Sequence, residues 1–247
     1  MGYNLAFAYV NCWACGKRPL TQTLSMLARI PYDQARKLLG DVDRERSRRR
    51  DIVRGRLELP PGVEPLADAH RDYLTGRGFD PDHLAEFWGV AGIGNAAGPL
   101  RWRLFIPVVH QGEVVSWTTR SISRRPGGRY RSAKASQESI PHKSILYGED
   151  HCGHSVIVHE GPFDVWRTGP GSVCTFGTDF TQAQVLRLSR YARRVICFDN
   201  NPEGQRQAVA LCDALSAFGP TDNVILTAKD AAEASRSEIR QLRALIA

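Results

Sequence analysis

Apolar residues in the second half of the chain gather into short runs, with helical patterns between them. Four runs are predicted to be strands, at residues 156–159, 172–176, 195–198 and 223–226. Three helical patterns separate them, at residues 163–168, from 181 onward and at 205–218. Strands that alternate with helices favour a parallel α/β sheet with right-handed crossovers.

Acidic residues follow two of these predicted strands directly. Glu160 ends the first run and Asp199 ends the third. Gly161 lets the backbone turn sharply after Glu160, and Pro162 suits the first turn of a helix. Because ligands gather at the carboxyl ends of parallel strands, these two acids are predicted to lie together and to form a Mg²⁺ site.

The first half of the chain has a different pattern, predicting two helices and an antiparallel hairpin. Residues 67–88 contain two helical segments split at 76–78, and the second opens with Asp80 as N-cap and Pro81 as first helical residue. Residues 104–109 and 114–118 are predicted to pair around a Gln111-Gly112 turn.

These patterns divide the chain into five parts. Residues 1–43 hold a Cys-x-x-Cys knuckle and a helix, and residues 44–67 form a basic, proline-containing linker. Residues 68–150 are predicted to be an α+β subdomain, residues 151–234 the α/β domain, and residues 235–247 a C-terminal amphipathic helix.

Several short motifs, in one order, resemble the TOPRIM domain of bacterial and phage primases. They are Glu160-Gly-Pro-Phe-Asp164, Thr175-Phe-Gly177, Phe198-Asp199-Asn-Asn201-Pro-Glu-Gly204 and Lys229-Asp230. The likeness continues upstream through Arg103-Leu-Phe-Ile-Pro107, Gly112, Arg120, Arg129-Tyr130, Lys143 and Leu146-Tyr-Gly148. The resemblance covers about residues 68–230 and is closest to small phage primases. It implies a Rossmann-like TOPRIM sheet preceded by a smaller, mixed α+β primase-like subdomain and a zinc-ribbon remnant.

The resemblance also implies a function and a metal site. The expected activity is that of a DNA primase, a nucleotidyltransferase that makes short primers on single-stranded DNA from nucleoside triphosphates. Glu160 and Asp199 are the expected catalytic acids, and Mg²⁺ or Mn²⁺ is the expected cofactor. The expected metal ligands are Glu160, Asp164, Asp199, Asn201 and Asp230.

One position departs from the family pattern. Primases generally have Asp-x-Asp at this strand end, whereas here the second residue is Asn201. An amide keeps a carbonyl oxygen but loses a negative charge, so a weaker metal site is expected. Glu203, two residues on, is a candidate to compensate for that charge.

Basic residues cluster between Arg101 and Lys134, where eight arginines and lysines stand against one acid, Glu113. Such a cluster is typical of a nucleic-acid surface, and the alternative is a solvated basic face. The resemblance places Arg103, Arg120, Arg129 and Lys143 among the residues that bind the nucleotide or the template. A second cluster, at residues 44–56, has seven arginines and two acids, and is typical of a charged helix or linker.

The N-terminal Cys12-Trp-Ala-Cys15-Gly sequence has the form of half a zinc ribbon. Three interpretations remain open for it: a relic without metal, a ribbon completed by another chain, or a Zn²⁺ site completed by His151, Cys152 or His154.

Composition narrows the setting of the protein. The chain has 247 residues, of which 42% are hydrophobic, and a net charge of +7, and it contains no apolar stretch long enough to span a membrane. Six cysteines without the character of a small secreted domain favour a reducing, cytoplasmic setting. The expected partners are single-stranded DNA, nucleoside triphosphates and a replicative helicase or a chain that completes the zinc ribbon. Two alternatives to a primase remain: a metal-dependent TOPRIM nuclease and a non-catalytic DNA-binding accessory protein.

Overall fold

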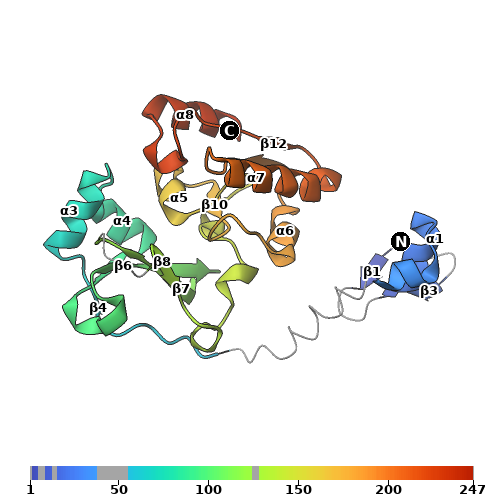
Figure 1. Ribbon diagram of the computed structural model, residues 1–247, viewed down its shortest axis with the longest axis horizontal. Coiled ribbons are helices and arrows are strands. Elements are labelled where there is room, and N and C mark those ends of the chain that lie inside the picture. The colour runs from blue at the N-terminus through green and yellow to red at the C-terminus, as the bar shows by residue number, and fades with distance from the viewer. Residues whose placement is uncertain (1, 5–8, 13–15, 38–54, 124–127, 247) are drawn as a thin grey trace. The chain divides into compact units, whose positions relative to one another are not determined.

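The computed structural model describes residues 2–4, 9–12, 16–37, 55–123 and 128–246, and the chain divides into two compact units, residues 1–53 and 54–247 (Figure 1). In the first unit, β1 (Gly2–Asn4), β2 (Tyr9–Cys12) and β3 (Gly16–Pro19) form an antiparallel sheet. It is followed by α1 (Leu20–Ala28) and by a helix over residues 32–37.

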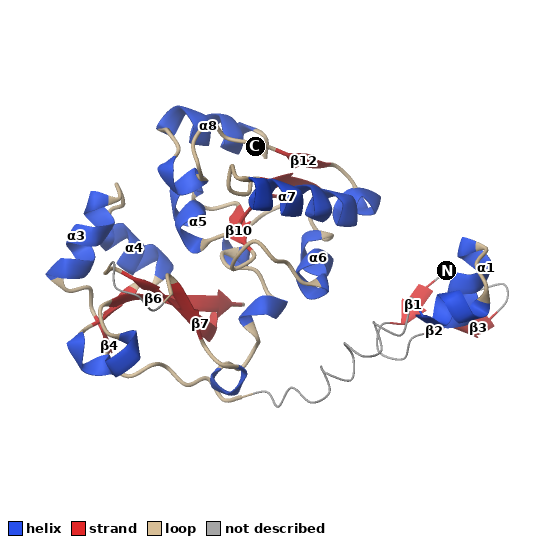
Figure 2. Cartoon of the chain, in the orientation of Figure 1, coloured by secondary structure: helices blue, strands red, loops and turns tan. Residues whose placement is uncertain are grey.

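The second unit begins with a five-stranded antiparallel sheet in the order β4-β5-β6-β7-β8 (Figure 2). Its strands are β4 (Val63–Glu64), β5 (Ala91–Ile93), β6 (Arg103–His110), β7 (Glu113–Ser121) and β8 (Tyr130–Ser132). Between β4 and β5 lie α3 (Asp68–Gly76) and α4 (Pro81–Trp88). Asp80 caps α4 by accepting hydrogen bonds from the N–H groups of Asp82 and His83, as its position before Pro81 predicts.

The β6–β7 hairpin confirms the predicted pairing around Gln111 and Gly112. Both residues have positive φ, at 55° and 79°, which matches the twist of a tight antiparallel turn. The carboxylate of Asp150 accepts hydrogen bonds from both of their N–H groups, at 3.0 and 2.9 Å. A side chain outside the hairpin therefore fixes the conformation of its turn.

A parallel sheet follows, in the order β10-β9-β11-β12. Its strands are β9 (Ser155–His159), β10 (Ser172–Cys174), β11 (Arg193–Ile196) and β12 (Thr221–Asn223). The helices are α5 (Pro162–Thr168), α6 (Gln182–Leu188), α7 (Pro202–Leu215) and α8 (Arg236–Ala244). The predicted α/β alternation is confirmed, although β12 begins two residues earlier and ends three residues earlier than its predicted range.

Side-chain alternation along these strands buries both faces of the parallel sheet. Val156 and Val158 pack with residues of α6 and α7, including Leu188 and Leu211. Ile157 lies in another cluster, with Val195 and with Ile239 and Leu242 of α8. Helices on both faces explain why the strands are continuous apolar runs.

One apolar core joins the two sheets of the second unit. Leu74, Phe79 and Trp88 from α3, α4 and their connection pack with Phe163 and Trp166 of α5. The expected boundary at residue 150 therefore does not separate two cores. The expected linker at 44–67 also differs from the structure, because Val63 and Glu64 pair with β5.

Short 3-10 helices connect several of these elements, at Asn95–Leu100, Ala135–Gln137, His142–Ser144, Glu149–His151, Ser216–Phe218 and Ala231–Glu233. Within the described ranges, no helix has the length and apolar character that crossing a membrane requires.

Candidate metal centre

The chain leaves the two central strands of the parallel sheet, β9 and β11, toward opposite edges of the sheet. A crevice lies between these connections at the carboxyl ends of the two strands. From β9 the chain leads through α5 to β10 on one side, and from β11 it leads through α7 to β12 on the other. Glu160 directly follows β9, and Asp199 lies three residues beyond β11. This is the position where open α/β sheets bind ligands.

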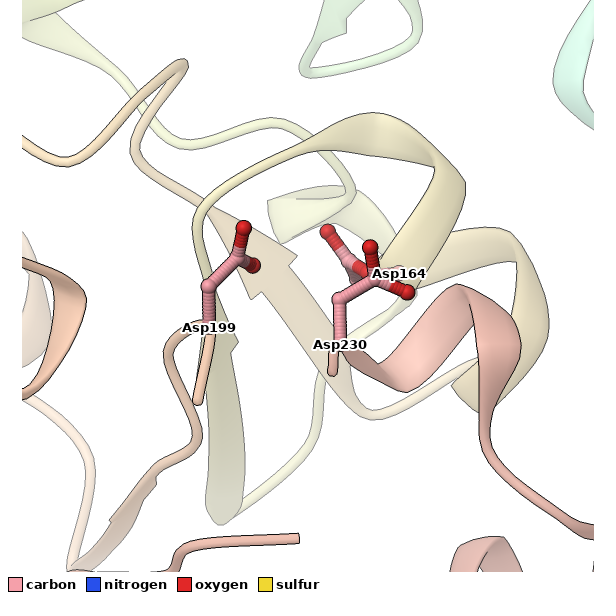
Figure 3. A group of neighbouring side chains, drawn as sticks. All are labelled: Asp164, Asp199 and Asp230. Carbon is pink, nitrogen blue, oxygen red and sulfur yellow. The ribbon is translucent and has the colours of Figure 1, made fainter. Parts of the chain in front are cut away.

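Three aspartates meet at this crevice. Asp164 in the first turn of α5, Asp199 after β11 and Asp230 before the short helix at 231–233 each offer a carboxylate oxygen, and these oxygens lie within 4.8 Å of one another. Figure 3 shows the three carboxylates facing a common point. Hard oxygen ligands in this arrangement fit a divalent cation such as Mg²⁺.

Asp164 also holds two loops of the site in place. One carboxylate oxygen accepts a hydrogen bond from the N–H of Gly161 at 3.2 Å, and the other accepts one from the N–H of Ala232 at 3.0 Å. Asp230 caps the same short turn by accepting from the N–H of Glu233 at 2.9 Å. The turn that carries Asp230 is therefore tied to α5.

The carboxylates of this crevice keep protons more readily than usual. Burial, then the charge of Asp230, raises the pKa of Asp164 to about 7. Burial, then the charges of Asp164 and Asp230, raises the pKa of Asp199 to about 6. Burial and the neighbouring Asp199 raise the pKa of Glu160 to about 7. Carboxylates that repel one another in this way gain most from a bound cation.

Glu160 lines the crevice but lies outside the group of three aspartates. Its Oε1 accepts a hydrogen bond from the N–H of Asp199 at 3.1 Å, which links the ends of β9 and β11. The first turn of α7 packs against it, and a Cβ on Gly204 would lie 2.5 Å from the carbonyl oxygen of Asp199 and 2.7 Å from Oε1 of Glu160. A glycine is therefore required at that position.

Asn201 has a different place from the one expected. Its Oδ1 accepts a hydrogen bond from the N–H of Gly204 at 2.9 Å and so caps α7. Neither Asn201 nor Glu203 is among the described residues that line the crevice. The Glu203 carboxylate instead pairs with Arg206, so the structure gives no support to its compensating for the missing charge.

Basic side chains also line the crevice, which has a volume of about 350 Å³. Arg120 and Arg129 come from the antiparallel sheet and its loop, Arg77 follows α3, and Lys229 precedes Asp230. We did not assign Arg77 or Lys229 from the sequence. Lys229 is adjacent to a predicted ligand, which is a usable signal, whereas nothing in the local pattern marks Arg77.

Arg120 is held rigidly in the crevice. Its Nε donates to the Tyr73 hydroxyl at 3.0 Å, and one terminal nitrogen donates to the Tyr130 hydroxyl at 2.8 Å. The guanidinium carbon lies 4.2 Å from the centre of the Phe163 ring. Such a fixed guanidinium is suited to an anionic ligand.

Arg103 and Lys143 lie elsewhere in the described structure. The buried Arg103 guanidinium donates to Thr119 and to the carbonyls of Gly128 and Arg129. Lys143 donates to the carbonyls of Thr175 and Asp179 at 3.0 and 2.7 Å. Neither lines the crevice, and their expected ligand contacts stay predictions.

The expected Zn²⁺ ligands remain a prediction. Cys12 ends β2, whereas Cys15 lies outside the described residues. Of the residues proposed to complete the site, Cys152 has its thiol against the carbonyls of Gly148 and Ser172, and burial raises its pKa to about 11. Arg124 and Arg125 of the basic cluster and most of residues 44–56 also lie outside the described residues.

Comparison with known families agrees with this geometry. A family model described as Toprim-like matches residues 157–235, which span the parallel sheet, the three aspartates and Glu160. These residues form a Toprim-like domain. No curated protein sequence matches the chain.

Solved structures extend the likeness beyond the Toprim-like domain. The zinc-binding and RNA polymerase domains of Aquifex aeolicus primase match with a TM-score of 0.61 and 17% identity, over 99% of this chain and 74% of that one. The DnaG catalytic core gives 0.56 and 17%, over 72% and 70%. The primase fragment of the bacteriophage T7 primase-helicase gives 0.55 and 17%, over 82% and 86%. The chain thus has the fold of a bacterial or phage-type TOPRIM primase.

Proposed function

We propose that this chain is a DNA primase-like nucleotidyltransferase that joins nucleotides on a single-stranded DNA template with Mg²⁺ or Mn²⁺. The observation that carries this proposal is a crevice lined by three aspartates and by Arg77, Arg120, Arg129 and Lys229. The acids suit a divalent cation, and the basic side chains suit the triphosphate and the template phosphates.

Asp164, Asp199 and Asp230 would hold the cation. When bound, a divalent cation lowers the pKa of the attacking hydroxyl and neutralises the charge of the leaving pyrophosphate. Arg120, fixed by two tyrosine hydroxyls, would hold a phosphate in one position without first losing side-chain freedom. Arg129 is exposed at the rim and would bind the nucleotide or the template.

Glu160 would accept the proton of the attacking 3′-hydroxyl. In the metal-free site, burial and then the charge of Asp199 raise its pKa toward neutral pH, which favours a general base. Its place beside Asp199 and outside the aspartate group leaves it available for this role.

Incubation of the full chain with a single-stranded template, labelled nucleoside triphosphates and Mg²⁺ or Mn²⁺ tests the proposal. We expect new short oligomers from the natural sequence and none from Asp199→Asn. Asp222→Asn is the matched control, because Asp222 is an exposed residue of β12 that pairs with Arg193 of β11 and lies outside the crevice lining. Shortened template would instead indicate a nuclease, and retention without synthesis would indicate an accessory binder; either result would overturn the proposal.

A further inference from the structure

Helix α8 carries a stripe of arginines on its exposed face. Arg236, Arg240 and Arg243 are exposed, whereas Ile239 and Leu242 are buried in the cluster that also holds Ile157 and Val195 of the sheet. Spacings of four and three residues place the arginines on one side of a helix, along about 10 Å of its axis. In the part of the chain that the structure describes, no carboxylate pairs with Arg236 or Arg240.

The one acid in the middle of α8 does not neutralise this stripe. Glu238 accepts hydrogen bonds from the N–H groups of Thr227, Ala228 and Ser235, and these bonds lower its pKa to about 2. The Glu238 carboxylate is therefore occupied by backbone N–H groups and not by the arginines of the stripe. The stripe keeps a net positive charge at every ordinary pH, because arginine does not deprotonate in proteins.

Helix α8 lies beside α5, the helix that carries Asp164 (Figure 1). At its C-terminal end, Arg243 donates to the carbonyls of Thr168 and Pro170. At its N-terminal end, α8 follows the turn at 231–233, where the Ala232 carbonyl accepts a hydrogen bond from Arg167 of α5 at 3.1 Å. These contacts with α5 fix the orientation of α8, and therefore of its arginines, on the Toprim-like domain.

Arg167 links this stripe to the crevice. It donates to the carbonyls of Arg77, Gly78 and Ala232 at 2.8, 3.0 and 3.1 Å. Ala232 lies four residues before Arg236, so Arg167 connects the segment that leads into α8 with Arg77. Because Arg77 lines the crevice, positive charge continues from the metal centre to α8.

We propose that Arg236 and Arg240 of the α8 stripe, whose direction Arg243 fixes, bind the phosphates of a single-stranded nucleic acid whose other part lies in the crevice. This inference rests on the proposed function and adds a second contact surface to it. Nucleic acid is favoured over an acidic protein because the positive charge is continuous with a crevice suited to phosphates.

The test measures binding of a fluorescein-labelled oligothymidylate of about 16 nucleotides to the full chain by anisotropy across a salt series. Nucleotides and divalent cations are left out. Losing two phosphate contacts lowers the slope of log affinity against log salt by about 1.4. We expect this change, and about tenfold weaker binding at low salt, from the double variant Arg236→Gln/Arg240→Gln. Glutamine keeps helix propensity close to that of arginine, and circular dichroism checks the fold.

The single variant Arg190→Gln is the control for Arg240→Gln, since it removes one exposed arginine beyond α6. An equal slope change in these two single variants, or none in the α8 double variant, would overturn the inference. Polyglutamate serves as a probe for an acidic protein partner. The inference would also be overturned if the α8 variant lost binding to polyglutamate but kept binding to oligothymidylate. Absence of primer synthesis with the expected slope change would overturn the proposed function alone.

Discussion

The two sheets of the second unit place their charged residues by different rules. In the parallel sheet, Glu160 and Asp199 meet because neighbouring parallel strands end at the same edge. In the antiparallel sheet, Arg103 pairs with Ser121 and Arg120 pairs with Leu104, so the two arginine side chains leave opposite faces of the sheet. Arg103 is committed to carbonyls, whereas Arg120 lines the crevice. Topology alone thus places the acids, whereas the role of each arginine depends on the face that it leaves and on the partners around its guanidinium.

Removing one aspartate of the metal centre should have the largest effect of the changes considered, which is a loss of metal affinity. Removing a unit charge about 4 Å from a divalent ion costs about 2 kcal/mol even in water-like surroundings, or about thirtyfold in affinity, and more in a buried site. We expect Asp199→Asn to weaken Mn²⁺ binding by at least about thirtyfold in calorimetry. Asp222→Asn should leave it unchanged, and equal losses in both variants would contradict a local site.

Replacing a buried arginine and replacing an arginine of the crevice should have different effects on the stability of the protein. Arg103→Met leaves buried carbonyls without donors, so we expect the free energy of unfolding to fall by about 2 kcal/mol in urea denaturation, with Mn²⁺ affinity preserved. Arg129→Met removes an exposed side chain and should change stability by less than about 0.5 kcal/mol while weakening nucleotide binding. A loss of stability from Arg129→Met, together with weaker nucleotide binding from Arg103→Met, would contradict these assignments.

The pH dependence of metal binding should show whether Asp164 is protonated in the metal-free site. Asp164, with its pKa near 7, must release a proton before it binds a cation, so affinity should rise about tenfold from pH 6 to pH 8 and level off above. In calorimetry, the heat should vary with buffer because protons are released. The metal-free folded state binds more protons than the unfolded chain between about pH 4 and 7. Its stability should therefore fall as pH rises through that range, and a flat metal affinity would contradict the raised pKa.

Asn201 should give the smallest effect at the metal. Since aspartate caps a helix as well as asparagine does, Asn201→Asp should keep stability and change Mn²⁺ affinity less than about threefold. Asn201→Ala should lower the free energy of unfolding by about 1 kcal/mol, because the N–H of Gly204 loses its partner. A large gain in metal affinity from Asn201→Asp would show that this side chain turns into the crevice.

The sequence predicted those features that depend on local pattern and topology. The strand–helix alternation, the Gln111-Gly112 turn and the approach of Glu160 to Asp199 follow from spacing and residue type. The convergence of Asp230 with Asp164 was expected only by family resemblance, since it depends on the bond from Ala232 to Asp164. The capping role of Asn201 and the crevice contact of Arg77 depend on side-chain partners that no periodicity encodes.

The apolar core that α3 and α4 share with α5 has a consequence for the chain as a folding unit. Phe79 packs edge-on against both Phe163 and Trp166, with ring centres 5.4 and 6.0 Å apart. A polypeptide cut after residue 150 would give two fragments, each presenting half of this aromatic contact to water. We therefore expect such fragments to aggregate separately and to complement each other when refolded together.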